Sequence, residues 1–476
     1  MDNAKQAFYQ KRQTHWDHVA DKLATWKGWG GYYRRRIAQV FKFNIPAGRE
    51  VLEIGCGNGD LLAQLDPAYG LGMDISPKMV ALAQKEHPNL EFVQMDGTDF
   101  NIGKKFDIVV LSDTVNDVWD VQSTFEKAHQ HLKARGHLLL NFYNRLWELP
   151  INMAARLGVA KPTLMQNWLT VEDIDNLLNL AGFERVREWV EVLMPFQIPL
   201  LTSFCNKFLV RFWPFRLFAM THFVVARPKP ASAAPRRLPS VSIVVPARNE
   251  AGNIKRIFEE TPLLCDHMEL VFVEGHSNDD TFKEVLKQIK AHPRIDASAY
   301  QQTGKGKGDA VRLGFSKAKG DILMILDADL TMPPEDLPRF YQAIVTGKGD
   351  FINGVRLVYP MEKNAMRFFN LIGNKAFTLV FTYLLGQPIK DTLCGTKVVW
   401  KSDYDMICAN RAYFGDFDPF GDFELIFGAA RLNLKIVDMP IRYRERTYGT
   451  TNIQRWKHGW LLLQMVFYAA GRLKFI

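Results

Sequence analysis

Short apolar runs alternate with amphipathic stretches along both halves of the chain. In the first half the pattern predicts strands at residues 50–54, 70–74, 91–94, 107–111 and 137–142, and helices at residues 77–86 and 121–133. In the second half it predicts strands at residues 241–245, 270–273 and 322–326, with a helix that opens at Asn249 and Glu250. Strands that alternate with helices are typical of parallel sheets covered by helices on both faces. The pattern therefore predicts an α/β protein.

Two segments depart from this alternation. Residues 195–221 are rich in aromatic and aliphatic residues, among which Lys207, Arg211 and Arg216 are spaced. This composition suits a helical insertion packed on the sheet, or an amphipathic surface that contacts a membrane or an acyl chain. Residues 455–476 carry basic residues around an apolar middle, which suits an interfacial helix or a packed C-terminal helix. The best apolar run, residues 460–471, is shorter than the roughly 20 residues that a membrane span needs.

A boundary between two domains is predicted near the middle of the chain. Residues 227–240 are rich in Pro, Ala and Arg and lack hydrophobic periodicity, which is typical of a linker. We therefore expect an N-terminal domain at residues 1–228, a linker at 229–239 and a C-terminal domain at 240–476 that ends in an amphipathic tail. The length of 476 residues fits two domains.

Composition and charge narrow the class of protein. The chain is 47% hydrophobic and 23% charged, which is typical of a globular protein, and its formal net charge of +9 favours anionic partners. No nucleic-acid partner is expected. The five cysteines are scattered and form no C-x-x-C pair, so neither a disulfide framework nor a zinc site is predicted. The first residues lack the apolar core of a signal peptide, so we expect a cytoplasmic protein that is able to contact the cytoplasmic face of the membrane.

A glycine-rich loop follows the first strand of the N-terminal half. Residues 51–59 read VLEIGCGNG, and glycines at such a turn let the backbone approach a ligand closely. Asp74 ends the next strand, where an acidic residue binds a ribose, and Asp96 follows the third strand, where a carboxylate could accept from an adenine amino group. The polar residues 112–117 follow the fourth strand, at the sheet edge where open α/β sheets bind ligands.

The order of these motifs over residues 28–228 resembles class I S-adenosylmethionine-dependent methyltransferases, whereas a dehydrogenase would carry G-x-G-x-x-G. The resemblance implies a Rossmann-like fold and a pocket for S-adenosylmethionine that is lined by Glu53, Gly55, Gly57, Gly59, Asp74, Asp96, Gly97 and Ser112. The methyl acceptor stays open, and its candidate bases are Asp113, Asp117, His129 and Tyr143. Tyr9, Trp16 and residues 32–36 suit either a lid over the cofactor or helices packed on the sheet.

The C-terminal half contains a denser set of motifs. Residues 241–250 read VSIVVPARNE, residues 271–281 read VFVEGHSNDDT, and residues 304–312 read GKGKGDAVR. Asp327 and Asp329 then follow an apolar strand, and two carboxylates on alternate residues cannot both point into a core. Such a pair suits a divalent ion that also binds diphosphate oxygens and stabilises a departing nucleotide diphosphate.

Together these motifs resemble the family-2 glycosyltransferases of the GT-A fold, and more closely their dolichol- or polyprenyl-phosphate mannosyltransferase branch, over residues 239–476. The resemblance implies that Asp327 and Asp329 bind Mg²⁺ or Mn²⁺. It also implies that the nucleotide is surrounded by Pro246, Asn249, Glu250, Glu274 and Ser277, with Lys307 nearby. Glu274 stands where the family has aspartate, and Gly275 replaces a second acidic residue, so the selectivity for base and sugar stays open.

The acceptor depends on which groups converge beside the metal site. An ionised phosphate needs cations, and Arg356, Arg367 and Arg446 suit it. A sugar hydroxyl needs a base, for which Asp391, Asp422 and Glu424 are candidates. We therefore predict a bifunctional enzyme that transfers a sugar from a nucleotide-diphosphate sugar to a polyprenyl phosphate with inversion, and a methyl group to an unidentified acceptor, for which a glycan is one candidate. The alternative is a glycosyltransferase acting on a saccharide hydroxyl, with the methyltransferase-like half as a binding or scaffolding module.

Overall fold

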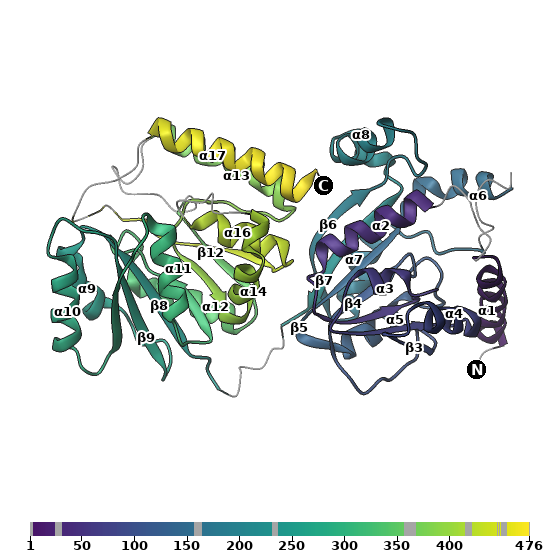
Figure 1. Ribbon diagram of the computed structural model, residues 1–476, viewed down its shortest axis with the longest axis horizontal. Helices are drawn as coiled ribbons and strands as arrows, with labels where there is room; N and C mark the ends of the chain where they lie inside the picture. Colours follow the sequence, from purple (N-terminus) through teal and green to yellow (C-terminus); the bar gives the residue numbers. More distant parts are fainter. Residues whose placement is uncertain are drawn as a thin grey trace. The chain divides into compact units, whose positions relative to one another are not determined.

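The computed structural model describes residues 3–23, 31–156, 164–230, 237–356, 368–414, 421–444, 446, 448 and 455–475. The chain divides into two compact units, Met1–Lys229 and Pro230–Ile476, each built on a sheet with helices against it (Figure 1). The prediction of an α/β protein is confirmed. Within the described ranges, no helix is long and apolar enough to cross a membrane.

The N-terminal unit contains a seven-stranded sheet of order β3-β2-β1-β4-β5-β7-β6. Its strands are β1 Glu50–Ile54, β2 Tyr69–Asp74, β3 Glu91–Gln94, β4 Phe106–Ser112, β5 Leu132–Tyr143, β6 Phe183–Glu191 and β7 Thr221–Pro228. The alternation of strands and helices indicated a parallel sheet, but this sheet is mixed, because β7 runs antiparallel to both β5 and β6. The connection from β6 to β7 contains only the seven-residue helix α8 Leu201–Lys207 and short turns, and the chain returns between β5 and β6 in the opposite direction.

The helices of this unit follow the predicted pattern with one correction. They are α1 Asn3–Leu23, α2 Gly31–Asn44, α3 Asp60–Gln64, α4 Pro77–Glu86, α5 Val121–Gln130, α6 Glu148–Arg156, α7 Val171–Leu180 and α8 Leu201–Lys207. The helix predicted at residues 121–133 ends at Gln130, because Leu132 is buried and pairs with Phe106 as the start of β5.

The C-terminal unit contains a second seven-stranded sheet, of order β10-β9-β8-β11-β13-β12-β14. Its strands are β8 Val241–Ala247, β9 Met268–Glu274, β10 Asp296–Gln301, β11 Ile322–Ile325, β12 Phe351–Val355, β13 Lys397–Trp400 and β14 Ile436–Pro440. This sheet is also mixed rather than parallel, because β13 runs antiparallel to β11 and β12. As a result, the chain segment that enters β13 lies beside the carboxyl end of β11.

The helices of the C-terminal unit are α9 Ala251–Glu260, α10 Thr281–Ala291, α11 Lys307–Lys317, α12 Leu337–Val345, α13 Phe368–Leu385, α14 Lys401–Ala409, α15 Arg411–Phe414, α16 Asp422–Arg431 and α17 Arg455–Ala469. The helix after β8 begins at Ala251 rather than at Asn249 and Glu250 as predicted. Asn249 has a left-handed φ of 57°, so the chain turns there, and Glu250 is the residue that precedes the helix. Both sheets bury apolar side chains on each of their faces, which leaves the loops at the strand ends to carry polar groups.

Candidate active sites

The glycine loop after β1 is fixed by the loops that follow β2 and β4. Gly55 has a φ of 76°, and a Cβ there would lie 2.5 Å from Thr114 Oγ1, so only glycine fits. Thr114 Oγ1 donates to the Ile54 carbonyl at 2.9 Å, and the Gly57 amide donates to Asp74 Oδ2 at 2.9 Å. The predicted residues of three strands thus meet at one sheet edge.

The remaining residues predicted to line this pocket lie along the same edge. Asp74 Oδ1 accepts from the Ser76 amide at 2.9 Å, and Asp96 Oδ1 accepts from the Thr98 amide at 2.8 Å. Gly97 lies against Ile54, because a Cβ there would be 2.9 Å from Ile54 Cγ2. Two further predicted residues are Ser112, which ends β4, and Gly59, which precedes α3 with a φ of 78°. A Cβ on Gly59 would meet Phe92 at 2.6 Å, so this glycine serves the packing of the unit.

Glu53 is a buried carboxyl group with an unusual environment. Its side chain is 2% exposed, and Oε2 has no hydrogen-bond partner within the described part of the chain. Burial raises the pKa of Glu53 well above its ordinary value. This unpaired oxygen lies directly before the glycine loop. A buried acceptor without a partner is expected in a binding site where the bound ligand supplies the missing hydrogen-bond donor. The residues present therefore fit S-adenosylmethionine.

Helix α1 rests on the loops that follow β2, β3 and β4. Tyr9 Oη and Thr98 Oγ1 share a hydrogen bond of 2.6 Å, and Trp16 Nε1 donates to Asp117 Oδ2 at 2.7 Å. Ser76 Oγ donates to Asp17 Oδ1 at 2.5 Å. Tyr9 and Trp16 therefore lie against the polar loops of the pocket rather than on a face of the sheet.

Asp113, at the carboxyl end of β4, is the best placed of the candidate bases. Its Oδ1 accepts from Tyr33 Oη at 2.9 Å and from Asn141 Nδ2 at 2.5 Å, while Tyr143 Oη lies 3.5 Å from Oδ2. Burial raises the pKa of Asp113 to about 6, against the lowering effect of these hydrogen bonds. Asp117 is instead paired with Arg12 at 3.0 Å. His129 packs on Phe183, the first residue of β6 and thus at the opposite sheet edge, so the structure does not bring it to the pocket.

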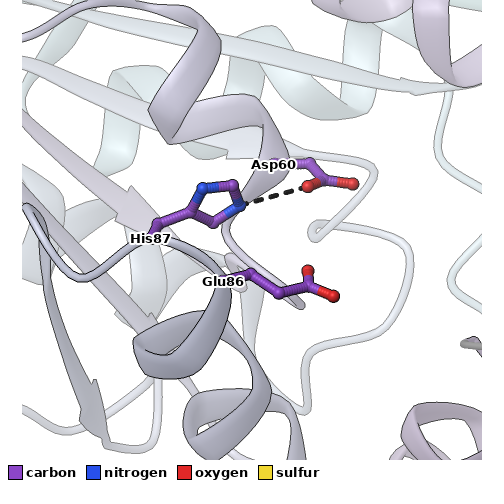
Figure 2. A group of neighbouring side chains, drawn as sticks. All are labelled: Asp60, Glu86 and His87. Carbon is purple, nitrogen blue, oxygen red and sulfur yellow. Dashed lines mark hydrogen bonds and ion pairs between the residues drawn. The ribbon is translucent and has the colours of Figure 1, made fainter.

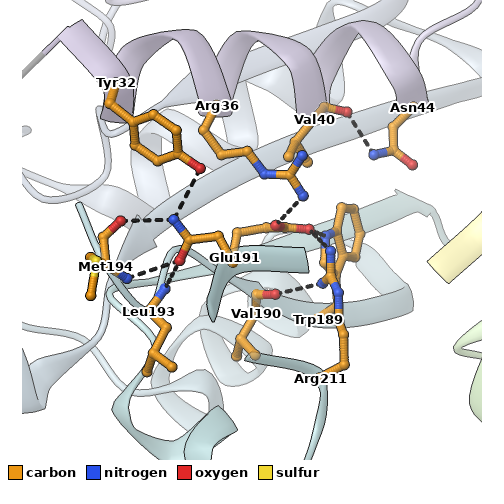
Figure 3. A network of polar contacts seen from close by, with 11 residues as sticks. Tyr32, Arg36, Val40, Asn44, Trp189, Val190, Glu191, Leu193, Met194 and Arg211 are labelled. Atoms are coloured by element: carbon orange, nitrogen blue, oxygen red, sulfur yellow. Dashed lines mark hydrogen bonds and ion pairs between the residues drawn. The ribbon is translucent and has the colours of Figure 1, made fainter. Parts of the chain in front are cut away.

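A cluster of buried charges, which the sequence did not reveal, fixes helix α2 beside this site. Glu191 accepts from Arg36 Nη2 at 2.9 Å and from Arg211 Nη2 at 2.6 Å, and all three side chains are less than one tenth exposed (Figure 3). Burial by itself raises the pKa of Glu191, but the two guanidinium groups outweigh it and the pKa is lowered. The cluster joins α2, the end of β6 and the segment that follows it.

A surface group of three possible metal ligands lies at the end of the glycine loop, where Asp60 follows Gly59. Asp60, Glu86 and His87 have ligand atoms within 4.8 Å of one another, and His87 Nε2 forms a hydrogen bond of 3.1 Å with Asp60 Oδ1 (Figure 2). Asp60 and Glu86 are exposed, and Asn58 donates to Glu86. These contacts account for the group as surface side chains held by hydrogen bonds.

In the C-terminal unit, the loops that follow β8 and β9 are joined by backbone-to-side-chain hydrogen bonds. The Asn249 amide donates to Ser277 Oγ at 3.0 Å, and the Asn278 amide donates to Asn249 Oδ1 at 2.8 Å. Ser277 in turn donates its amide to Glu274 Oε1 at 2.5 Å. The predicted nucleotide residues Asn249, Glu274 and Ser277 therefore form one wall of the candidate donor site. Pro246 stands near the end of β8, the strand that leads into this wall.

The acidic pair lies next to this wall and is contacted by two cations. Lys307 Nζ lies 2.6 Å from Asp327 Oδ1, and Arg446 Nη2 lies 2.6 Å from Asp329 Oδ2. Arg446 Nη1 is also 3.4 Å from Glu250 Oε1. Burial lowers the pKa of Lys307, but the carboxylates, led by Asp327, outweigh it and raise the pKa. Burial raises the pKa of Glu250 to about 7.

The loop that enters β13 closes against the acidic pair. A Cβ on Gly395 would lie 1.9 Å from Asp327 Oδ2 and 2.2 Å from Lys307 Nζ. This cradle, together with the hard oxygen donors of Asp327 and Asp329, fits a divalent cation such as Mg²⁺ or Mn²⁺.

The other predicted catalytic residues are held in ion pairs. Arg356 contacts Asp391 through Nε at 2.7 Å and through Nη2 at 2.9 Å, and Asp391 is fully buried. Both oxygens of Glu424 are engaged, with Arg312 at 2.8 Å and Arg411 at 2.7 Å. Arg367 lies outside the described residues.

Asp422 differs from Asp391 and Glu424, because its nearest cation is more distant. Lys397 Nζ lies 3.7 Å from Asp422 Oδ1, and burial raises the pKa of Asp422 despite this lysine. Lys397 is fully buried and also donates to the Cys394 carbonyl. Sequence reasoning missed Lys397, because it stands in an apolar run, and missed Asp279, although it lies in a motif that was singled out. Asp279 Oδ2 accepts from Tyr448 Oη at 3.3 Å, and Tyr448 lies on Gly252.

Comparison with known proteins matches a part of each unit to a family model. Residues 242–416 match the model for glycosyl transferase family 2, and residues 51–136 match a methyltransferase domain model. An undecaprenyl-phosphate 4-deoxy-4-formamido-L-arabinose transferase of Edwardsiella ictaluri is 34% identical over 217 residues, which cover 44% of this chain and 61% of that protein. A dolichol-phosphate mannosyltransferase of Pyrococcus furiosus is 30% identical over 219 residues, which cover 45% of this chain and 59% of that protein.

The chain spans about half to three fifths of the length of the curated relatives it matches. Among solved structures, a putative methyltransferase in complex with the Trm112 activator of Haloferax volcanii superposes with a TM-score of 0.36 at 19% identity, covering 45% of this chain and 97% of that one. The resemblance predicted for each half is confirmed by the family models. The chain carries two enzyme domains: a methyltransferase domain in its N-terminal unit and a glycosyl transferase family 2 domain in its C-terminal unit.

Proposed function

We propose that the C-terminal unit transfers a sugar from a nucleotide-diphosphate sugar to a polyprenyl phosphate. An acceptor phosphate oxygen attacks the anomeric carbon as the bond to the nucleotide diphosphate breaks, with inversion at that carbon. The observation that carries the proposal is the meeting of Asp327, Asp329, Lys307 and Arg446 at one sheet edge, beside the wall formed by the β8 and β9 loops. Cations and a metal site suit a leaving diphosphate.

Asp327 and Asp329 would hold Mg²⁺ or Mn²⁺, which would supply positive charge against the diphosphate oxygens of the donor. Lys307 and Arg446 now neutralise these carboxylates, at 2.6 Å each. Both cations are long and flexible, so they are able to move from the carboxylates to the phosphates when a donor binds.

A phosphate acceptor is favoured over a saccharide hydroxyl by the state of the candidate bases. Asp391 is held by Arg356 and Glu424 by two arginines, which leaves Asp422 as the one candidate base without a close ion pair in the described residues. An ionised phosphate needs no base. The two relatives named above also act, by their names, on undecaprenyl phosphate and dolichol phosphate.

A lipid acceptor also agrees with the apolar surface of the C-terminal unit. Helices α13 and α17 contact each other. They expose Leu379, Tyr383, Trp460 and Phe467, of which Leu379 and Phe467 are more than 70% exposed. We propose that this surface contacts the membrane in which the acceptor lies.

We propose further that the N-terminal unit transfers a methyl group from S-adenosylmethionine, with Asp74 and Asp96 at the adenosine and Glu53 completing the pocket. Asp113 would accept the proton of the methyl acceptor at Oδ2, the oxygen that Asn141 does not contact. The alternative, in which this unit is only a scaffold, predicts no binding of the cofactor.

The sugar transfer is tested by a donor screen with the full chain, a short-chain polyprenyl phosphate, and Mg²⁺ or Mn²⁺. We expect metal-dependent formation of a lipid-linked sugar, and a loss of roughly 100-fold or more in Asp329→Asn, because half of the metal's carboxylate ligands are removed. Asp280→Asn is the matched control, since Asp280 is exposed and pairs with Lys283. Product on a saccharide acceptor but none on the lipid phosphate would contradict the proposal.

Cofactor binding is tested by titration calorimetry of the full chain with S-adenosylmethionine. Asp74→Ala should weaken binding by roughly 10- to 100-fold, because hydrogen bonds to a charged carboxylate contribute about 1.5–3 kcal/mol. Asp99→Ala, at an exposed carboxylate that pairs with Lys127, should bind as the wild type does. Absence of binding by the wild type would establish the scaffold alternative.

A further inference from the structure

The segment between β6 and β7 buries several of its polar side chains and exposes many of its large apolar ones. It contains α8 and two short turns, η2 Leu209–Arg211 and η3 Phe215–Phe218. The buried side chains include Thr202, Asn206 and Arg211, each less than one tenth exposed. A surface segment in contact with water alone shows the reverse distribution.

The exposed side chains of this segment form what we call the aromatic surface. It comprises Leu200, Phe204, Trp213, Phe215, Leu217 and Phe218, whose exposed fractions range from 43% to 88%. Trp147 Nε1 donates to the Phe218 carbonyl at 2.9 Å, which brings α6 beside it, and α6 adds Leu149 at 74% exposed. Apolar patches of this kind mark contact sites.

Buried hydrogen bonds hold the aromatic surface in place. Asn206 accepts from the amides of Leu193 and Met194 at 2.7 and 2.9 Å, and donates to the Met194 carbonyl at 2.7 Å. Arg211 donates to the Val190 carbonyl at 2.8 Å and to Glu191, within the charge cluster of Figure 3. The outward direction of the aromatic side chains is therefore set by the fold.

Charge indicates what covers this surface. Residues 192–221 contain no Asp or Glu, and their basic residues include Lys207, which is exposed, and Arg216, whose side chain is 49% exposed. Arg216 lies 3.9 Å from Glu188 of β6, but the segment itself supplies no carboxylate. Aromatic side chains beside exposed cations are typical of a surface that lies in the headgroup region of an anionic membrane. A second copy of the chain would bring the same cations against this surface.

The aromatic surface is joined directly to the residues around Asp113. Asn206 Nδ2 donates to Tyr32 Oη at 3.1 Å, and Tyr32 precedes Tyr33, which donates to Asp113. On the other side, Asn144 Nδ2 donates to the Leu217 carbonyl at 3.0 Å, and Asn144 follows Tyr143. The acceptor side of the methyltransferase domain therefore lies next to this surface.

We propose that the aromatic surface binds a bilayer containing anionic phospholipid, and that the N-terminal unit takes its methyl acceptor from that bilayer. The lipid binding stands on the surface itself; only the statement about the acceptor rests on the proposed methyl transfer. The test therefore measures binding and uses no turnover.

The experiment measures the partitioning of the full chain onto vesicles of phosphatidylglycerol and phosphatidylcholine by flotation. It is done in a Trp460→Ser/Phe467→Ser background, which removes exposed aromatic side chains of α17 from the comparison. We expect the chain to bind these vesicles, and to bind less when salt is added or when the vesicles contain phosphatidylcholine alone. We expect the partition coefficient to fall by more than about tenfold when Phe204, Trp213 and Phe218 are replaced by Ser. Leu263→Ser, at a side chain that is 76% exposed in the C-terminal unit, is the matched control.

Three results would overturn the proposal. They are absence of vesicle binding in the α17 background, equal partitioning with and without the aromatic side chains, and a dimer that becomes monomeric in the Phe204→Ser/Trp213→Ser/Phe218→Ser variant. The last result, read by light scattering, would assign the surface to a second copy of the chain. An unchanged thermal unfolding profile excludes loss of fold as the cause, since all three side chains are exposed.

Discussion

Gly395→Ala is expected to abolish sugar transfer, with a loss of more than about 1000-fold in kcat/KM, because one methyl group disturbs two polar groups at once. A Cβ at this position would lie 1.9 Å from Asp327 Oδ2 and 2.2 Å from Lys307 Nζ. The short side chain of Asp327 follows the buried residue Leu326 and has little room to move, whereas the flexible side chain of Lys307 would be pushed away from the carboxylate that it contacts. The methyl group would therefore occupy the space in which we place the metal and the diphosphate.

The effect of Gly395→Ala should appear in donor binding as well as in turnover. We expect the affinity for the nucleotide-diphosphate sugar in the presence of Mn²⁺ to fall by more than tenfold, while the thermal unfolding of the N-terminal unit is unchanged. Gly471→Ala is the matched control, because a Cβ there meets nothing within 4 Å. A Gly395→Ala chain that keeps a tenth of the wild-type rate would show that the loop before β13 does not close on the reacting groups.

The residues that sequence reasoning located best are those that end apolar strands. Asp74, Asp113 and Asp327 each follow a run of apolar residues whose burial is fixed by the sheet. Within each sheet, parallel neighbours bring the strand ends to one edge, so linear order is enough to place Asp74 near Asp113 in the first sheet and Asp327 near the β8 loop in the second. The same reasoning predicted α4 at residues 77–86 with its observed bounds.

The contacts that sequence reasoning did not reveal depend on pairing between distant segments. The insertion of β13 antiparallel to β11 brings Gly395 to Asp327, and nothing in the local pattern distinguishes β13 from a parallel strand. Arg356 and Asp391 are 35 residues apart, and their ion pair exists only because the loops of β12 and β13 meet. For this reason Arg356→Ala does not report on the acceptor, since it would leave Asp391 buried without its cation.

Glu191→Ala is expected to destabilise the N-terminal unit by about 3–5 kcal/mol, because it leaves two buried guanidinium groups without a carboxylate. Arg36 and Arg211 are 7% and 6% exposed in their side chains. In a domain of this size, a change of that magnitude lowers the unfolding temperature by roughly 10 °C, which calorimetry of the full chain would resolve as a shift of one transition. Glu126→Ala, at an exposed residue of α5 that accepts from Gln122, should shift it by less than about 2 °C.

The pH dependence of this cluster has a defined sign. The pKa of Glu191 is lowered in the folded chain, so its contribution is present above the ordinary pKa of about 4.5 and is lost as the pH falls through the folded value. The difference in stability between the wild type and Glu191→Gln should therefore narrow on acidification and be widest at neutral pH.

Because Arg211 also anchors the segment that carries the aromatic surface, Glu191→Ala should weaken vesicle partitioning together with stability, whereas Phe204→Ser/Trp213→Ser/Phe218→Ser should weaken partitioning alone. Equal partitioning in Glu191→Ala and the wild type would mean that the surface is held without the charge cluster.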